Sequence, residues 1–407
     1  AVGTVVSSGA YQNVYDGGMV SQTVVSAGGI QQVGLGGTAS GASVAGYLLV
    51  ADGGRAYDVV LETGGRQMVS SGGHAEGGVV SSGAWLSVGM GGTAVGVQVQ
   101  DSGYMEVLSG GTASGAQVSG YVFAEGEFAG RYPDAGDYSE LSSIGGGRQT
   151  ILSGGTAVDT VVFAAGRQWV LSGGVASRTF VSGALSYTDA LENNARLGVK
   201  GGGKVYDATA VYYGRILVSS GASAVRSIVS SGGRVTVSMG GLAYSSIVSS
   251  GGDERISAAA SSFSATILSG GSQDVHGTAV DAVLSSGGLQ KVWAGGRAEG
   301  TVVSSGAWQD IWSGGTAADT TIFSGGWQNV WSAGRAEDVV LSGGLQNVSS
   351  GGTAVGTQVG LNGWQHIGEN GRAEGTVVSS GGVQDIWSGG TAVDAVLSSG
   401  GLQKVWA

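Results

Sequence analysis

The stretch Thr301 to Asp319 reads TVVSSGAWQDIWSGGTAAD, and Thr376 to Asp394 reads TVVSSGGVQDIWSGGTAVD. Both copies carry a Gln followed two residues later by Ile, and glycines divide each copy into short segments. The Gln recurs from Gln290 to Gln403 with spacings of 19, 19, 18, 19, 19 and 19 residues. A strict period near nineteen residues predicts a solenoid, in which each coil contacts only its neighbours.

The repeated glutamines share one pattern, a Val or Ile two residues further on, and they are Gln12, Gln31, Gln67, Gln149, Gln168, Gln273, Gln290, Gln309, Gln328, Gln346, Gln365, Gln384 and Gln403. In a strand, residues two apart lie on the same face. The Gln and its Val or Ile therefore either both point inward, with the amides stacked as a hydrogen-bonded ladder, or both lie near a corner. We favour a structural ladder over a catalytic role.

Each period contains three segments of three to five residues, Thr-Val-Val, x-Gln-x-Val-x and Thr-Ala-x. Segments rich in Val, Ile and Thr and bounded by Gly are typical of strands, and the glycines leave no helical periodicity. The sequence therefore predicts an all-β fold, a parallel β-helix with three strands in each coil and about twenty coils of about 19 residues. Val303 and Val378 should point inward, and Ala317 should lie where the cross-section narrows.

The regularity of the repeat varies along the chain. Two stretches break the register, and the first of them holds the only proline, Pro133. Insertions in a solenoid become loops on one face, which are candidate functional sites or tolerated surface loops. The expected organisation is β-helix coils at 1–130, a polar insertion at 131–147, coils at 148–184, an irregular insertion at 185–207, degenerate coils that lack the Gln at 208–264, and regular Trp-rich coils at 265–407.

Composition limits the classes of partner. The 407 residues have a formal net charge of −11, and no run of Lys and Arg stands in the sequence, which disfavours binding to nucleic acid or to anionic lipid. Cysteine is absent, which excludes disulfides and Cys-ligated zinc. The chain has no signal peptide or transmembrane run and begins and ends inside a repeat, so we expect it to be a piece of a longer protein.

Catalytic and metal-binding patterns are weak. Parallel β-helices can act on polysaccharides, and glycoside hydrolysis needs two carboxylates held close together. The acidic residues recur instead at one corner of the repeat, at Asp159, Asp281, Asp319, Asp338 and Asp394. The three histidines, His74, His276 and His366, lie in different coils without metal-ligand spacing. We therefore expect no catalytic residues, metal or cofactor, with a polysaccharide-acting enzyme as the alternative.

Eight of the ten tryptophans follow Gln290, namely Trp293, Trp308, Trp312, Trp327, Trp331, Trp364, Trp387 and Trp406. Trp308 and Trp312 alternate with Gln309 and Ile311 along the chain, so in a strand their side chains point to the opposite face. If Ile311 is inward, these indoles point outward and stack from coil to coil, which we favour over inward tryptophans with solvent-facing glutamines. An exposed aromatic stripe marks a contact face for protein or sugar. The first seven of these tryptophans, with Asp319, Asp338 and Asp394, are our candidates for a self-association or ligand face.

Paired serines recur at one turn of the repeat, at Ser7 and Ser8, Ser81 and Ser82, Ser304 and Ser305, and Ser379 and Ser380. Serine caps turns by bonding to its own backbone. A regular column of accessible hydroxyls is also a good acceptor array for O-glycosylation, so these serines are candidate glycosylation sites.

The repeat wording at 301–319 and 376–394 resembles the AIDA-type repeat of Gram-negative autotransporter adhesins, and the resemblance covers most of the chain. It implies a right-handed, three-stranded β-helix that is a secreted passenger, displayed on the cell surface through a C-terminal outer-membrane barrel absent from this sequence. It also implies aggregation and biofilm formation through contacts between identical passengers on neighbouring cells. Our own hypothesis is that these contacts are lateral, with the passengers antiparallel. Host surfaces or glycans are further expected partners. A glycosyltransferase that adds heptose to serines is another expected partner, and this chain would be its acceptor.

Overall fold

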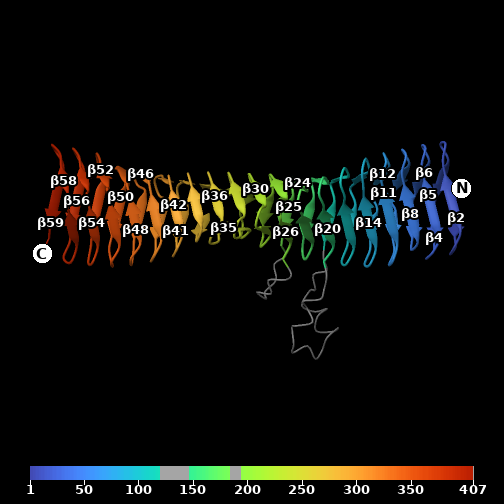
Figure 1. Ribbon diagram of the computed structural model, residues 1–407, viewed down its shortest axis with the longest axis horizontal. Coiled ribbons are helices and arrows are strands. Elements are labelled where there is room, and N and C mark those ends of the chain that lie inside the picture. Colours follow the sequence, from blue (N-terminus) through green and yellow to red (C-terminus); the bar gives the residue numbers. More distant parts are fainter. Residues whose placement is uncertain (120–145, 184–193, 407) are drawn as a thin grey trace, which may run out of the picture. The chain divides into compact units, whose positions relative to one another are not determined.

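The computed structural model describes residues 1–119, 146–183 and 194–406, and every regular element in these ranges is a β-strand. Two compact units divide the chain, one formed by 1–217 with 221–224 and the other by 218–220 with 225–407. In each unit the strands stack in coils, three to a coil (Figure 1). The predicted three-stranded parallel β-helix is confirmed.

The coil around Gln309 shows how the repeat makes three strands. Thr-Val-Val gives β43 (Val302–Val303), the Gln segment gives β44 (Trp308–Ile311), and Thr-Ala-Ala gives β45 (Thr316–Ala318). Each strand pairs in parallel with its counterpart in the next coil, as Gln309 does with Gln328. We call the three resulting sheets B, C and A, respectively.

Sheet C carries the Gln segments, and its strands are β2 (Tyr11–Val14), β5 (Ile30–Val33), β8 (Tyr47–Val50), β11 (Arg66–Val69), β14 (Trp85–Val88), β17 (Tyr104–Val107), β20 (Arg148–Ile151), β23 (Arg167–Val170), β26 (Arg196–Val199), β29 (Arg215–Val218), β32 (Arg234–Val237), β35 (Asp253–Ile256), β38 (Ser272–Val275), β41 (Leu289–Val292), β44, β47 (Trp327–Val330), β50 (Leu345–Val348), β53 (Trp364–Ile367), β56 (Val383–Ile386) and β59 (Leu402–Val405). The second and fourth residues of these four-residue strands point inward.

Sheet A carries the Thr-Ala segments, and its strands are β3 (Met19–Ser21), β6 (Thr38–Ser40), β9 (Arg55–Tyr57), β12 (His74–Glu76), β15 (Thr93–Val95), β18 (Thr112–Ser114), β21 (Thr156–Val158), β24 (Val175–Ser177), β27 (Lys204–Tyr206), β30 (Ser223–Val225), β33 (Leu242–Tyr244), β36 (Ser261–Phe263), β39 (Thr278–Val280), β42 (Arg297–Glu299), β45, β48 (Arg335–Glu337), β51 (Thr353–Val355), β54 (Arg372–Glu374) and β57 (Thr391–Val393). Only the middle residue, usually Ala, points inward, as expected of Ala317.

Sheet B has the shortest strands, β1 (Val5–Val6), β4 (Val24–Val25), β7 (Ser43–Val44), β10 (Val60–Leu61), β13 (Val79–Val80), β16 (Gln98–Val99), β19 (Gln117–Ser119), β22 (Val161–Phe163), β25 (Phe180–Ser182), β28 (Thr209–Val211), β31 (Ile228–Val229), β34 (Ile247–Val248), β37 (Thr266–Ile267), β40 (Val283–Leu284), β43, β46 (Thr321–Phe323), β49 (Val340–Ser342), β52 (Gln358–Val359), β55 (Val377–Val378) and β58 (Val396–Leu397). The second residue of each is the inward one, and Val303 and Val378 are buried as predicted.

The repeated glutamines form an internal amide ladder. Gln309 is fully buried, and its Nε2 donates to Oε1 of Gln290 at 2.7 Å. A buried threonine, Thr320, donates to Oε1 of Gln309 at 3.3 Å, so this amide oxygen accepts one bond from Thr320 and one from Gln328. Of the two orientations left open by the sequence, the inward one is confirmed, and the ladder satisfies amides that would be costly to bury alone.

The ladder bonds recur in both units, as Gln31 to Gln12 and Gln168 to Gln149 in the first, and as Gln290 to Gln273, Gln309 to Gln290, Gln328 to Gln309, Gln346 to Gln328, Gln365 to Gln346, Gln384 to Gln365 and Gln403 to Gln384 in the second.

The coils that lack the Gln are nevertheless regular. In the stretch expected to be degenerate, Ile216, Val235 and Glu254 occupy the Gln position and are buried. The described part of the expected insertion at 185–207 is also ordinary coil, with β26 and β27, so the irregular assignment is wrong there. Leu197 replaces the Gln in β26, and an aliphatic side chain fills the core as well. Residues 131–145 and 185–193 of the two expected insertions lie outside the described residues.

Candidate interaction faces

An exposed column of tryptophans runs along sheet C of the second unit. Trp308, Trp327 and Trp364 each begin a strand and are 44%, 39% and 39% exposed. The next residue in each strand is a fully buried Gln. The outward orientation predicted from strand parity is therefore confirmed, and we call these three residues the outer Trp column. Their role in contacts stays a prediction.

A second set of tryptophans stacks at the turn from sheet C to sheet A. The ring centroids of Trp293 and Trp312 are 5.6 Å apart at 11° between planes, and those of Trp312 and Trp331 are 6.1 Å apart at 24°. His276 continues this stack against Trp293 at 6.0 Å, and Trp387 stacks on Trp406 at 5.6 Å elsewhere in the unit. We call Trp293, Trp312 and Trp331 the stacked Trp column. Their rings are half-buried and cover one another, which gives them a packing role.

Polar side chains lie between the two columns. Asn329 donates to Oδ1 of Asp310 at 2.8 Å, and Asn347 donates to Oδ1 of Asn329 at 2.9 Å. Further along, the buried Asp385 lies between His366 Nε2 at 3.8 Å and Lys404 Nζ at 3.9 Å. Burial lowers the pKa of His366, and the Asp385 carboxylate partly opposes this. The outer face of sheet C is thus aromatic at both margins and hydrogen-bonding in the middle.

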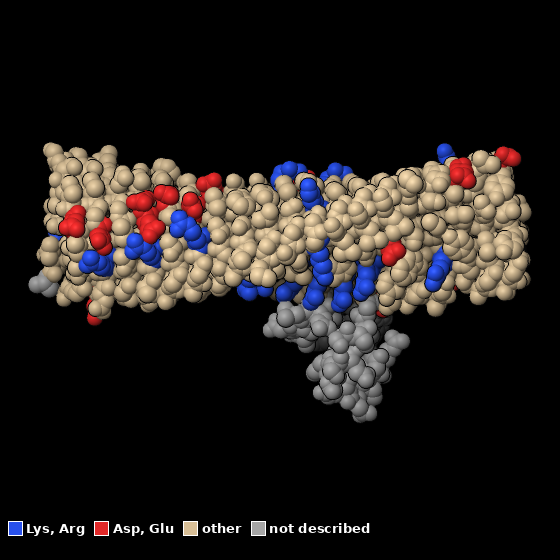
Figure 2. Space-filling model, in the orientation of Figure 1, with Lys and Arg blue, Asp and Glu red and all other residues tan. Residues whose placement is uncertain are grey.

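The outer face of sheet A in the second unit carries ion pairs in every second coil. Arg297 pairs with Glu299 at 3.3 Å, Arg335 with Glu337 at 2.5 Å, and Arg372 with Glu374 at 3.4 Å. In Figure 2, acidic (red) and basic (blue) side chains lie side by side over the coils that Figure 1 colours orange and red. These pairs are exposed and add little stability individually, but they give the face a regular charge pattern.

The corner aspartates have a backbone role that the sequence reasoning missed. Asp319 and Asp338 adopt the left-handed conformation, with φ of 53° and 50°, and so does Asp394 at 52°. Gly300 takes the equivalent position one coil earlier, with φ of 65°. Asp and Gly are residues that tolerate this conformation. The recurrence of Asp or Gly at this position of the repeat is therefore the sequence signal that indicates a left-handed corner residue.

These aspartates do not join the tryptophans. The Asp corner leads from sheet A to sheet B, whereas the outer Trp column is on sheet C and the stacked Trp column is at the turn from C to A. The structure therefore divides the candidate face predicted from the sequence into separate sides of the coil.

The paired serines lie at the turn from sheet B to sheet C. The second serine of the pairs, as in Ser82, Ser305 and Ser380, is exposed. The glycine after Ser305 and its counterpart Gly325 have φ of 71° and 77°. A Cβ at Gly325 would meet the Ser305 hydroxyl at 2.6 Å, so the small residue leaves room for the serine of the neighbouring coil.

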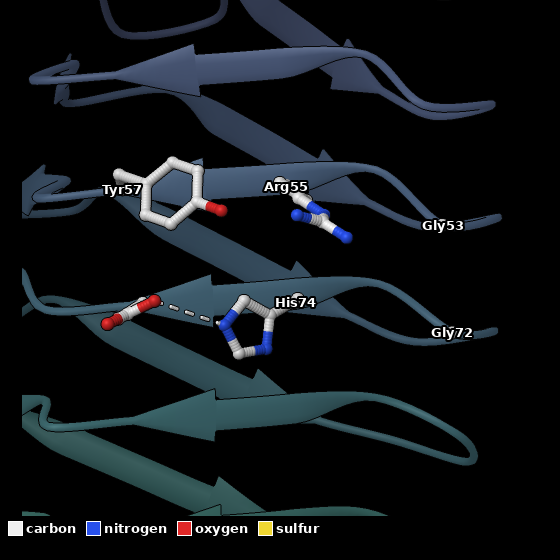
Figure 3. Close-up of a pocket in the computed structure, with 6 residues that line it drawn as sticks. Gly53, Arg55, Tyr57, Gly72 and His74 are labelled. Atoms are coloured by element: carbon white, nitrogen blue, oxygen red, sulfur yellow. Dashed lines mark hydrogen bonds and ion pairs between the residues drawn. The ribbon is translucent and has the colours of Figure 1, made fainter.

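A shallow depression lies on sheet A of the first unit, where Arg55 and Tyr57 of β9 face His74 and Glu76 of β12 (Figure 3). His74 Nδ1 lies 2.8 Å from Thr93 Oγ1, and its Nε2 lies 3.5 Å from Glu76 Oε2. Glu76 is the only carboxylate among the lining residues, whereas glycoside hydrolysis uses two. The depression therefore lacks the constellation that the enzyme alternative requires.

Coiling creates a basic cluster that is invisible as a run of sequence. Arg148, Arg167, Arg196 and Arg215 begin β20, β23, β26 and β29, and their side chains project from sheet C of the first unit. The sequence has no run of Lys and Arg, but a cluster forms in three dimensions because the coils place residues 19 to 29 apart side by side. In Figure 2, Lys and Arg side chains (blue) gather over the coils that Figure 1 colours green.

Within the described ranges, no helix is long and apolar enough to cross a membrane, and no group of three or more His, Asp or Glu side chains is placed to hold a metal ion.

Comparison with known protein families finds a match to two segments of the chain. Residues 50–103 and 274–326 match the family model AIDA, described as the adhesin of the bacterial autotransporter system, probable stalk. The two matched segments carry the repeat of the AIDA-type autotransporter adhesins. The resemblance expected from the repeat sequence is confirmed, and it supports an adhesin passenger.

Among solved structures, the AIDA-type passenger is similar to the TibC-catalysed hyper-glycosylated TibA fragment 55–350, with 28% identity over 86% of this chain and 97% of that chain at a TM-score of 0.48. It is also similar to the Dettilon tailspike protein, with 12% identity over 88% of this chain and 61% of that chain at a TM-score of 0.24. No curated protein matches the sequence.

Proposed function

We propose that this AIDA-type passenger is displayed on a Gram-negative cell and links cells, in aggregates and biofilms, through repeated lateral contacts between identical passengers. The observation that carries the proposal is the outer Trp column, since three indoles at the same strand position stay about two-fifths exposed while their neighbours are buried. Large aromatic side chains dominate the energetics of protein contacts.

Because the coils repeat, weak contacts at each coil are sufficient to hold two passengers together. Each coil presents the same kinds of side chain at the same height as the next, so two passengers that touch at one coil bring further coils together. Linked weak contacts raise the overall strength of association by orders of magnitude without any single strong site. A non-enzymatic role follows, because the exposed groups are spread along the faces rather than gathered around a reacting atom.

A mixed-cell experiment tests self-association. Cells that display the passenger carry one fluorescent label, and bare cells carry another. The proposal predicts aggregates made of displaying cells alone. Recruitment of bare cells in proportion to their number would instead assign the contacts to a receptor present on both, and would contradict homotypic association.

We further propose that the exposed serines of the B-to-C turns are O-glycosylated with heptose, which would make this chain the acceptor of a glycosyltransferase. The accessible hydroxyls of Ser82, Ser305 and Ser380 support this proposal. Intact mass of the passenger from its native host tests it, with peptide mapping to the serine turns. A mass equal to that of the bare polypeptide would contradict it.

A further inference from the structure

Sheet A of the second unit carries two parallel rows of opposite charge. The strands β42, β48 and β54 all read Arg-Ala-Glu, and in each of them the Ala is buried while the Arg and the Glu point outward. The strands between them, β45 and β51, have Thr at the first position and Ala or Val at the third. Parallel pairing in register therefore gives an Arg row and a Glu row, made of Arg297, Arg335 and Arg372 and of Glu299, Glu337 and Glu374. The two rows run side by side in Figure 2.

The charges in these rows have a fixed direction. Successive pairs lie two coils apart, which is about 10 Å, and the two rows are about 6.5 Å apart along the strand. Every Arg is on the same side of its Glu, so the ion pairs are dipoles that all point the same way across the sheet. The exposed corner residues Asp319 and Asp338, which directly follow β45 and β48, add negative charge on the side of the Glu row.

Such a face distinguishes a parallel from an antiparallel copy of the same chain. Two identical faces can be placed against each other by a two-fold axis that runs along the stack of coils or by one that runs along the strands. The first axis keeps the copies parallel and exchanges the rows, so the Arg row of each copy faces the Glu row of the other. The second axis makes the copies antiparallel and leaves the rows in place, so Arg faces Arg and Glu faces Glu.

The ion pairs within each strand leave room for a second partner. Arg297 and Glu299 pair with each other and are still 44% and 45% exposed. A guanidinium group has five N–H donors and a carboxylate about four acceptor sites, so each group can also bond across an interface. Opposed like charges at an interface suppress the wrong arrangement, and opposite charges fix the register. The charge pattern of this face therefore favours a parallel second copy.

We propose that sheet A of the second unit joins passengers side by side, in parallel, on the surface of one cell. This inference rests on the proposed surface display, because passengers anchored to the same cell are parallel and lie at the same height. Each exposed ion pair is weak by itself, and anchoring raises the effective concentration at which the pairs form. The contact goes beyond the association between cells, since it uses sheet A whereas the outer Trp column is on sheet C.

An exchange of charges tests the orientation. The exchanged chain has Arg and Glu swapped in all three strands, by Arg297→Glu, Glu299→Arg, Arg335→Glu, Glu337→Arg, Arg372→Glu and Glu374→Arg. The exchange keeps an ion pair in every strand and the same net charge, and thermal unfolding establishes that the chain is folded. In a parallel contact the exchanged chain fits another exchanged chain but opposes the parent. In an antiparallel contact it fits the parent and opposes itself.

Cross-linking between passengers on one cell measures which chains pair. The sequence has no cysteine, so Thr353→Cys, between two charged coils, gives each chain a single thiol for a short bis-maleimide. Cells display the parent and the exchanged chain together, each with its own epitope tag. We expect at least about threefold fewer mixed dimers than random pairing gives, because like charges face each other in them. Added salt should lower the yield of cross-linked dimers.

The matched control exchanges an exposed ion pair of the first unit, by Asp159→Arg with Arg178→Asp, and this chain should pair with the parent at random. Random pairing of the chain exchanged on sheet A, an excess of mixed dimers, or no cross-linked dimers of the parent would each overturn the proposal. The settling of cells should be the same for the parent and the exchanged chain, since the contacts between cells are assigned to sheet C. Failure of this inference is thus distinguishable from failure of the proposed function.

Discussion

Gln328 donates from its Nε2 to Oε1 of Gln309 at 2.6 Å inside the coil, although the two residues are nineteen apart in sequence. The stacked coils bring these two amides together, because each coil places its Gln at the same position of the strand as the coil before it. It also makes the ladder cooperative, since each Gln is a donor to one neighbour and an acceptor from the next.

Removing one Gln from the ladder should therefore leave two neighbouring side chains without their hydrogen-bond acceptor. Gln309→Leu leaves Nε2 of Gln328 and Oγ1 of Thr320 without an acceptor in the core. We expect the free energy of unfolding to fall by about 2–4 kcal/mol, since each orphaned buried polar group costs about 1–3 kcal/mol. Urea unfolding of the variant measures this.

The matched control is Thr320→Val, which removes only the hydrogen bond from Thr320 to Oε1 of Gln309. This variant should lower the free energy of unfolding by about 1 kcal/mol. Equal losses in the two variants would contradict the ladder as described.

Glu254 predicts a pH-dependent stability. Its carboxyl group occupies a Gln position, is fully buried, and accepts bonds from Gln273 Nε2 at 2.8 Å and from Ser262 Oγ. Burial raises its pKa above the ordinary 4.5, so the folded protein holds this proton more tightly than the unfolded chain. Stability should be highest below the unfolded pKa and should fall as pH rises from there through the folded pKa.

Glu254→Gln restores the ladder residue and removes the buried acid. The variant should be more stable than the parent at neutral pH, and this part of the pH dependence should vanish from its unfolding curves. The control is Glu299→Gln, an exposed acid paired with Arg297. A parent stability that rises from pH 5 to 7 relative to Glu254→Gln would contradict the assignment.

Gly198 and Trp169 should be energetically coupled, because the two are paired on neighbouring strands and a Cβ on Gly198 would be only 2.1 Å from Trp169 Cζ3. Gly198→Ala places a methyl group against the indole, and displacing the ring should destabilise the coil by about 1–3 kcal/mol, as overpacking does. In a Trp169→Leu background the same change should be nearly neutral, because a leucine can move aside. A double-mutant cycle on unfolding free energies measures the coupling, and additive effects would show that the two residues do not compete for space.

The corner position should accept Gly in place of Asp but reject a β-branched residue. Asp319 has φ of 53°, so Asp319→Gly should change stability little, whereas Asp319→Val should cost about 1–2 kcal/mol for a side chain forced into the left-handed region. Thermal unfolding of both variants checks this. A Val variant as stable as the Gly variant would contradict the conformational role.

Much of the fold is predictable because one residue marks the period. The repeated Gln gave the coil length, and parity then placed Ile311 inside and Trp308 outside. The arginine column was missed because Arg148, Arg167, Arg196 and Arg215 are separated by 19, 29 and 19 residues, and the long middle interval hides the register. The first residue of each Gln-type strand, read as a column, would have revealed it.

The division of the candidate face had a different cause. Asp319 and Trp312 are only seven residues apart in sequence, yet a turn and the strand β45 lie between them, and neighbouring segments of a three-sided coil face different directions. The coil-to-coil stacking expected of Trp312, by contrast, is present, since Trp312 stacks on Trp293 and Trp331.

The settling of cells that display the passenger tests the central claim most directly. Changing Trp308, Trp327 and Trp364 together to serine should leave the cells suspended, because the outer Trp column is lost. Changing Phe163, Phe180 and Phe323 to serine, which removes similarly exposed rings from sheet B, should leave settling as fast as in the parent. Equal surface display is established with an antibody. Unchanged settling of the Trp variant, or the same loss in the Phe variant, would contradict the account.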